Sequence, residues 1–116
     1  SLLMKPNSRK AKGRYLQNIV RDRIIKMFPR LTKDDIRCSM MSENGADVKL
    51  ITHTARKVFP YSIECKNQEK FTSIYNIMDQ AKSHNDYEPL AFIKMNNKKP
   101  LVILDAEYFM KLYHHE

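Results

Sequence analysis

The sequence lacks the apolar runs and the cysteine patterns that mark several classes of protein. No apolar run approaches the roughly 20 residues of a membrane span, and no signal peptide is visible. The two cysteines, Cys38 and Cys65, stand 27 positions apart, with no CxxC motif and no histidine at zinc-like spacing. We therefore expect no disulfide framework and no structural zinc, but two small buried side chains in a protein of the reducing cytoplasm.

Internal repeats and low-complexity linkers are absent as well. With 116 residues, of which 42% are hydrophobic, the chain is long enough for one core and too short for two. Residues 1–8 are predicted to be a flexible basic lead. Its first three residues, Ser-Leu-Leu, come without an initiator methionine and are interpreted as a cloning remnant. Residues 9–116 are expected to form a single domain.

Acidic residues are scarce in the first third of the chain. Residues 1–33 hold ten Lys or Arg against one acid, Asp22, whereas residues 34–116 hold eleven against twelve. The net charge of +8 therefore comes entirely from the first third. Such an asymmetry favours a polyanionic partner, because basic side chains that neutralise phosphates release counterions. A solubilising basic surface is the alternative, since no aromatic-rich RNA-binding motif adds to the case.

This basic segment is predicted to be a helix that begins at Ser8, a good N-cap residue, and ends before Pro29. Its apolar residues recur at the i, i+3, i+4 spacing of a buried stripe: Leu16, Ile19, Val20, Ile24, Met27 and Phe28. A polar ridge follows one edge of that stripe: Lys10, Arg14, Gln17 and Arg21.

Three strands are expected next. The first two flank a turn at residues 43–45, where Asn-Gly is a strong hairpin signal. A connection over residues 52–57 leads to the third strand, over residues 58–67. The core face of the first strand comprises Ile36, Cys38 and Met40. The second has a polar face, Asp47 and Lys49, and an apolar face, Val48 and Leu50. The third has an apolar face, Phe59, Tyr61, Ile63 and Cys65, and a mixed face, Ser62, Glu64 and Lys66.

The second half of the chain predicts a helix, two strands and a closing helix. The helix over residues 71–84 has an apolar stripe of Ile74, Ile77, Met78 and Ala81. Strands over residues 89–95 and 100–104 follow, and Asp105 caps a helix over residues 106–113. We therefore predict an α/β domain with a small mixed sheet flanked by helices.

One face of the third strand carries a pattern with a chemical use. Glu64 and Lys66 lie about 7 Å apart along the strand, and the adjacent strand brings Asp47 to the same face. Two carboxylates beside a lysine suit a hard cation such as Mg²⁺, which takes its other ligands from water and substrate phosphate. The ion polarises the phosphoryl oxygen and lowers the pKa of a bound water, while the lysine orients that water or offsets phosphate charge. A solvated strand face with a weak salt bridge is the alternative.

A resemblance to a known family rests on five segments: GADVKL, FPYSIECKN, SRKAKGRYLQNIVRDRI, DQAK and KPLVILDAEYF. Together they resemble the core of the PD-(D/E)XK nuclease superfamily, whose members share a restriction-endonuclease-like αβββαβ scaffold. Within it the chain is similar to small phage-type endonucleases and Holliday junction resolvases, from about residue 8 to residue 112. It departs from the name-giving motif at Ala46, which stands where a proline often precedes the aspartate.

The resemblance implies roles for the residues of the pattern. Asp47 and Glu64 would be metal ligands, and the backbone carbonyl of Cys65 would supply a third. Lys66 would position or activate the attacking water. Many members carry a further glutamate on the first helix. The matching position here is the neutral Gln17, which binds a metal-bound water or a phosphate but attracts a cation less, so one or two metals are left open.

Further residues are assigned by the same resemblance. Gln80 matches a glutamine that points towards the active site or the DNA backbone, and a surface position is the alternative for Gln17 and Gln80 alike. The candidates for contacts to the DNA backbone are Lys10, Lys12, Arg14 and Arg21, with Lys94 as a fifth unless it is a plain exposed lysine. The four histidines, His53, His84, His114 and His115, form no ligand set, and the three at or near helix ends are expected on the surface.

The expected function is a metal-dependent DNA endonuclease whose products carry a 5′-phosphate and a 3′-hydroxyl, in a bacterial or phage-infected cell. Its cofactor would be Mg²⁺, with Mn²⁺ as a substitute, and no membrane would be involved. A small basic domain has little surface for base-specific recognition, which favours structure-selective cutting of branched or flapped DNA. Resolving a symmetric junction would require a homodimer. A non-catalytic nucleic-acid-binding module on the same scaffold is the alternative, and an RNA-binding or ribosome-associated protein is a third.

Overall fold

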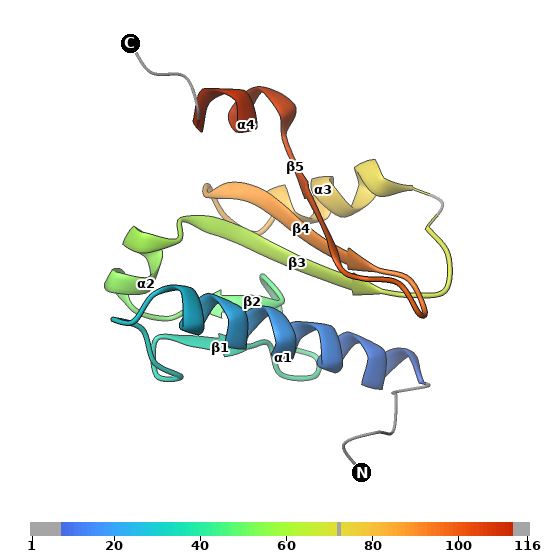
Figure 1. The fold of residues 1–116 in the computed structure, drawn as a ribbon, viewed down its shortest axis with the longest axis horizontal. Coiled ribbons are helices and arrows are strands. Elements are labelled where there is room, and N and C mark those ends of the chain that lie inside the picture. The colour runs from blue at the N-terminus through green and yellow to red at the C-terminus, as the bar shows by residue number, and fades with distance from the viewer. Residues whose placement is uncertain (1–7, 72, 113–116) are drawn as a thin grey trace.

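A computed structural model describes residues 8–71 and 73–112, so nearly all of the expected flexible lead, together with His114 and His115, lies outside the described residues. The elements run in the following order: α1 (Arg9–Met27), β1 (Ile36–Cys38), β2 (Val48–Leu50), α2 (His53–Val58), β3 (Tyr61–Asn67), α3 (Ile74–Lys82), β4 (Glu88–Lys94), β5 (Leu101–Leu104) and α4 (Ala106–Leu112). The predicted α/β class is confirmed (Figure 1).

The first helix begins and ends where the sequence predicts. The Ser8 side chain accepts a hydrogen bond from the N–H of Ala11 at 3.1 Å, as an N-cap does. Three apolar positions of the expected stripe are buried: Leu16, Val20 and Ile24. Met27 was expected in that stripe and is 57% exposed. The helix ends there, and Phe28 packs against the core in its place.

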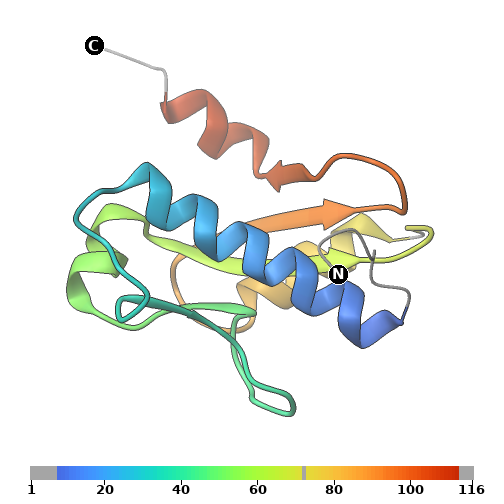
Figure 2. The same ribbon diagram turned by 60° about the horizontal axis from the view of Figure 1, so that its bottom comes forward.

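The five strands form one mixed sheet in the order β1-β2-β3-β4-β5. β2 is antiparallel to both of its neighbours, β1 and β3, while β4 runs parallel to β3 and β5 is antiparallel to β4. Figures 1 and 2 show α1 on one side of this sheet and α3 on the other. The central strand β3 is therefore covered on both faces.

The expected hairpin forms, but its first strand is shorter than predicted. β1 pairs with β2 through the register Ile36↔Leu50, and Gly45 takes the positive φ of +100° that the turn requires. Met40 was expected on the core face of the first strand and is instead 72% exposed. The Glu43 carboxylate explains this, since it binds the Met40 N–H at 2.8 Å and the Arg37 guanidinium at 2.7 Å. These contacts fold the chain into a loop.

The connection expected at residues 52–57 is in fact the short helix α2. Thr52 caps it by accepting the N–H of Ala55 at 3.2 Å. Ala55 is fully buried, and Val58 and Phe59 pack against the same core at i+3 and i+4. The third strand consequently begins at Tyr61 and not at residue 58.

The second face of the sheet is covered by α3, which begins at Ile74 and not at residue 71. Ile77 and Ala81 are buried as predicted, whereas Ile74 is 41% exposed at the first turn. The Ser62 hydroxyl donates to the Ala81 carbonyl at 2.7 Å, which fixes the end of α3 above β3. Glu64 on the same face of β3 is therefore buried.

The chain closes with β5 and α4 at the far side of the sheet from β1 (Figure 1). Asp105 caps α4 as predicted, since its Oδ1 accepts the N–H of Tyr108 at 2.8 Å. Tyr108 then contacts Tyr61, with their hydroxyls 3.2 Å apart. Within residues 8–71 and 73–112, no helix is long and apolar enough to cross a membrane.

Candidate active site

The candidate site lies where β2 and β3 separate. The two strands are joined by the pair Val48↔Ile63, and the N–H of Asp47 still donates to the Ile63 carbonyl at 3.0 Å. One step further, the N–H of Cys65 donates to Oδ2 of the Asp47 side chain at 2.8 Å. A carboxylate thus replaces the backbone ladder and holds the strands apart.

Glu64 stands opposite Asp47 across this opening, close enough for the Asp47 carboxyl to raise the pKa of Glu64. Glu64 is only 1% exposed. Its burial, followed by the hydrogen bond to Asp47 and the charge of that group, raises the pKa of Glu64 to about 8. The expected convergence of the two carboxyl groups on one face is therefore observed.

Lys66 follows two positions later on the same face and is half-buried. Its positive charge acts in the opposite sense on Glu64, because it lowers the pKa of that carboxyl. The structure therefore brings Asp47, Glu64 and Lys66 into one electrostatically coupled group.

Cys65 contributes its backbone to this group. In an extended strand the N–H and the C=O of one residue point to the same edge. Since the Cys65 N–H points to Asp47, the Cys65 carbonyl opens towards the same gap. Its thiol is buried as predicted, and this burial raises the thiol pKa. Cys38, expected to be buried too, is only half-buried, with Arg21 at 3.9 Å from its sulfur.

His84 is the residue of the site that the sequence reasoning missed. It was expected on the surface, but its Nε2 lies 3.9 Å from Oε1 of Glu64 and its side chain is 20% exposed. The cause is the packing of α3, whose end is fixed above β3 by the bond from Ser62 to Ala81. No local signal marks His84, because its position depends on two elements that are distant in sequence.

The two glutamines are not brought into hydrogen-bond contact with the carboxyl pair within residues 8–71 and 73–112. Gln17 is half-buried on α1, which covers the Ile63 and Cys65 face of β3. Gln80 lies on α3 and is exposed. Their proposed roles stay predictions.

The basic residues of α1 lie near the end of the strand that carries Glu64 and Lys66. The Asn67 side chain donates to the Lys12 carbonyl at 2.9 Å, which ties the first half of α1 to the end of β3. Lys94 lies opposite Asn67 in the register of β3 and β4, and it is half-buried, not fully exposed. Lys10 and Arg14 are exposed. Arg21 already forms a salt bridge, since its Nε donates to the Asp22 carboxylate at 3.0 Å.

The donor set at the opening fits a hard divalent cation. Two converging carboxyl groups and the Cys65 carbonyl are all oxygen ligands, the type that Mg²⁺ prefers. The pKa of Glu64 is raised first by burial and then by the neighbouring Asp47 carboxyl. Among the described residues no cluster of three or more His, Cys, Asp or Glu side chains forms a metal site. Such a cation would therefore depend on backbone, water and substrate oxygens for its remaining ligands.

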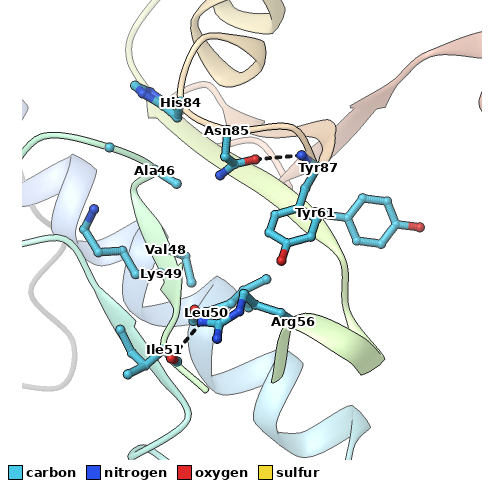
Figure 3. A pocket seen from close by; sticks show the side chains of 11 residues that line it. Ala46, Val48, Lys49, Leu50, Ile51, Arg56, Tyr61, His84, Asn85 and Tyr87 are labelled. Atoms are coloured by element: carbon cyan, nitrogen blue, oxygen red, sulfur yellow. Dashed lines mark hydrogen bonds between the residues drawn. The ribbon is translucent and has the colours of Figure 1, made fainter. Parts of the chain in front are cut away.

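A pocket of about 360 Å³ is shown in Figure 3, and its lining residue His84 connects it to the carboxyl pair through the 3.9 Å contact with Glu64. Ala46 and Val48, which flank Asp47 in the sequence, form part of its wall, and so does His84. The other lining residues come from β2, α2, the start of β3 and the loop after α3: Gly45, Lys49, Leu50, Ile51, Arg56, Tyr61, Asn85 and Tyr87.

Comparison of the chain with known protein families, with curated proteins and with solved structures gives no match. The resemblance to PD-(D/E)XK nucleases therefore stays a prediction from the sequence. What the protein does is inferred below from the residues of its own site.

Proposed function

We propose that the protein is a metal-dependent deoxyribonuclease that hydrolyses phosphodiester bonds on a restriction-endonuclease-like αβββαβ core. One observation carries this proposal: the carboxyl groups of Asp47 and Glu64 converge beside Lys66 where β2 and β3 separate. The order of α1, β1 to β3, α3 and β4 supports the proposed core, with α2 inserted and β5 and α4 added.

The carboxyl pair is costly to the folded protein unless a cation binds it. Glu64 is buried beside a second carboxyl, so ionising Glu64 places a second negative charge next to Asp47, away from water. A Mg²⁺ or Mn²⁺ ion held by Asp47, Glu64 and the Cys65 carbonyl would remove that repulsion. When bound, such an ion supplies Lewis-acid polarisation of a phosphoryl oxygen.

The remaining residues act on the substrate and on the pair. Lys66 presents an ammonium next to Glu64, where it orients the attacking water or offsets the charge that develops on the phosphate. His84 lies 3.9 Å from Glu64 and holds this carboxyl in position. Lys66 is placed by β3 itself, whereas His84 is placed by the end of α3, which the bond from Ser62 to Ala81 fixes above β3.

DNA is the substrate that the charge distribution favours. Lys10, Lys12 and Arg14 lie on α1, which Asn67 ties to the end of β3. Contacts from these side chains to phosphates hold a duplex in place without reading its sequence. Structure-selective cutting of branched or flapped DNA follows as the proposed specificity, and a symmetric junction would be cut by a homodimer.

The test compares cleavage of linear, flapped and four-way-junction DNA in Mg²⁺, in Mn²⁺ and in EDTA. We expect metal-dependent cutting by the wild type and a loss of at least about 10³-fold in Asp47→Asn. Glu69→Gln, which removes an exposed carboxylate just beyond β3, is the matched control and should cut normally. Salt-sensitive binding of DNA without cutting in any metal would overturn the proposal and favour the non-catalytic module.

A further inference from the structure

The pocket beside the carboxyl pair lies on a part of the sheet that no helix covers. α3 covers β3 and β4 on this face, and α1 covers the opposite face. The pocket lies between β2, α2 and the loop after α3, and Lys49, Arg56 and His84 are among its lining residues. A ligand in the pocket would therefore lie next to a phosphate bound at the carboxyl pair.

The charge of the pocket suits an anion. Its lining includes Arg56, Lys49 and His84 but no aspartate or glutamate. Nη1 of Arg56 donates to the carbonyls of Leu50 and Ile51 at 3.0 and 2.8 Å, which holds the guanidinium along the pocket floor (Figure 3). Among the described residues no hydrogen bond is found for its Nε and Nη2, so these N–H groups of a lining residue remain for a ligand.

Lys49 contributes less of this charge than Arg56. Its Nζ donates to the Asn44 carbonyl at 2.7 Å and lies 3.8 Å from the Glu43 carboxylate. That carboxylate, whose pKa the Arg37 hydrogen bond holds at about 2, partly neutralises the ammonium. Arg56 is therefore the main candidate for a phosphate contact.

Tyr87 provides an aromatic surface in the same pocket. Tyr87 is 37% exposed, and its backbone N–H donates to Oδ1 of Asn85 at 2.9 Å, which shapes the loop that carries Tyr87. An exposed aromatic face next to a guanidinium is the combination that binds single-stranded nucleic acid, because bases stack on the ring while the cation meets the backbone. A base inside a duplex has its faces covered and cannot enter.

From these observations we propose that the pocket receives an unpaired nucleotide adjoining the scissile phosphate, with Arg56 at its phosphate and Tyr87 against its base. The volume of about 360 Å³ lies within the range of small-ligand sites. This inference rests on the proposed nuclease function and supplies the reason for its preference for branched or flapped DNA.

The direct test measures binding in EDTA, where cleavage plays no part. The 5′-phosphorylated dinucleotide pTpT is titrated into ¹⁵N-labelled protein, and amide shifts are followed by NMR. We expect the largest shifts at Ala46, Ile51 and Tyr87. Binding should weaken about tenfold in Tyr87→Leu and in Arg56→Gln. Tyr75→Leu and Lys57→Gln, which change exposed residues outside the pocket, are the matched controls.

Shifts confined to α1, with equal affinity in Tyr87→Leu and Tyr75→Leu, would overturn the inference. A cleavage assay separates this failure from a failure of the proposed function. If the wild type cuts flapped DNA but Tyr87→Leu cuts it equally well, the pocket assignment is wrong and the nuclease stands. If the wild type cuts no DNA yet pTpT binds at Tyr87, the nuclease is wrong and the nucleotide site stands.

Discussion

The two sides of β3 behave differently. Along β4, all seven residues of β3 are paired in parallel, from Tyr61↔Glu88 to Asn67↔Lys94. Along β2, pairing is limited to Val48↔Ile63, after which the Asp47 side chain takes the N–H of Cys65. A complete ladder uses the backbone groups of a strand, and an interrupted one leaves them available. The candidate chemistry lies on the interrupted side for that reason.

The side chains follow the same division. On the β4 side, Ala91 and Ile93 join Ile77 in an apolar cluster that stabilises the fold. On the β2 side, two carboxyl groups lie close together, and burial and the neighbouring Asp47 raise the pKa of Glu64 to about 8. The well-packed β4 side of β3 thus supports the β2 side, whose buried carboxyl pair lowers stability, as residues of functional sites often do.

The largest expected effect concerns two lysines, Lys66 on β3 beside the carboxyl pair and Lys94 on the neighbouring strand β4. Lys66→Met should lower kcat for DNA cleavage by about 10²- to 10³-fold, because it removes the charge next to the carboxyl pair. Lys94→Met, one strand away, should change cleavage only severalfold and through KM. Steady-state kinetics on flapped DNA with Mg²⁺ measures both. Equal losses in the two variants would contradict the division between the two sides of β3.

The next effect is on stability in EDTA. Because the pKa of Glu64 is about 8 in the folded protein and near 4.5 unfolded, the folded state keeps a proton that the unfolded chain releases. This contribution is complete below about pH 4.5 and is lost as the pH rises towards 8. Glu64→Gln should not lose free energy of unfolding in this pH range. At pH 8 its free energy of unfolding should exceed that of the wild type by on the order of a few kcal/mol.

Urea unfolding at pH 4.5, 6 and 8 checks this expectation, with Glu69→Gln as the control for an exposed carboxylate. The gap between Glu64→Gln and the wild type should widen with pH. A constant gap would mean that the carboxyl pair is not coupled as described.

A smaller effect is expected from metal. Mg²⁺ should stabilise the wild type at pH 8 by about 1.4 kcal/mol at ten times its Kd, since it binds the folded state alone. Asp47→Asn should lose this stabilisation. Thermal unfolding with and without MgCl₂ measures it, and an equal response of both proteins would place the ion elsewhere.

The smallest effect concerns the bond that positions α3. Ser62→Ala removes the buried hydrogen bond to the Ala81 carbonyl and should lower the free energy of unfolding by about 1 kcal/mol. Ser83→Ala, which removes an exposed bond to the Gln80 carbonyl, should change it by less than about 0.5 kcal/mol. Chemical unfolding of the two variants compares them. The reverse order would argue against Ser62 as the anchor of α3.

Local signals predicted much of the fold. Ser8 and Asp105 cap helices because their side chains reach N–H groups three residues on. Gly45 marks the turn because it accepts a positive φ. The alternation along β3 placed Glu64 and Lys66 on one face, and pairing of the second strand with β3 added Asp47. These are contacts between near neighbours or adjacent strands.

The sequence by itself therefore determined the class of fold, the caps, and the face that carries Asp47, Glu64 and Lys66. Only the tertiary structure decided that α2 replaces a loop, that His84 meets Glu64, and that a pocket opens on the uncovered side of β2. The reason is physical. Caps, turns and alternation depend on backbone geometry over a few residues, whereas burial and charge coupling depend on how distant elements pack together.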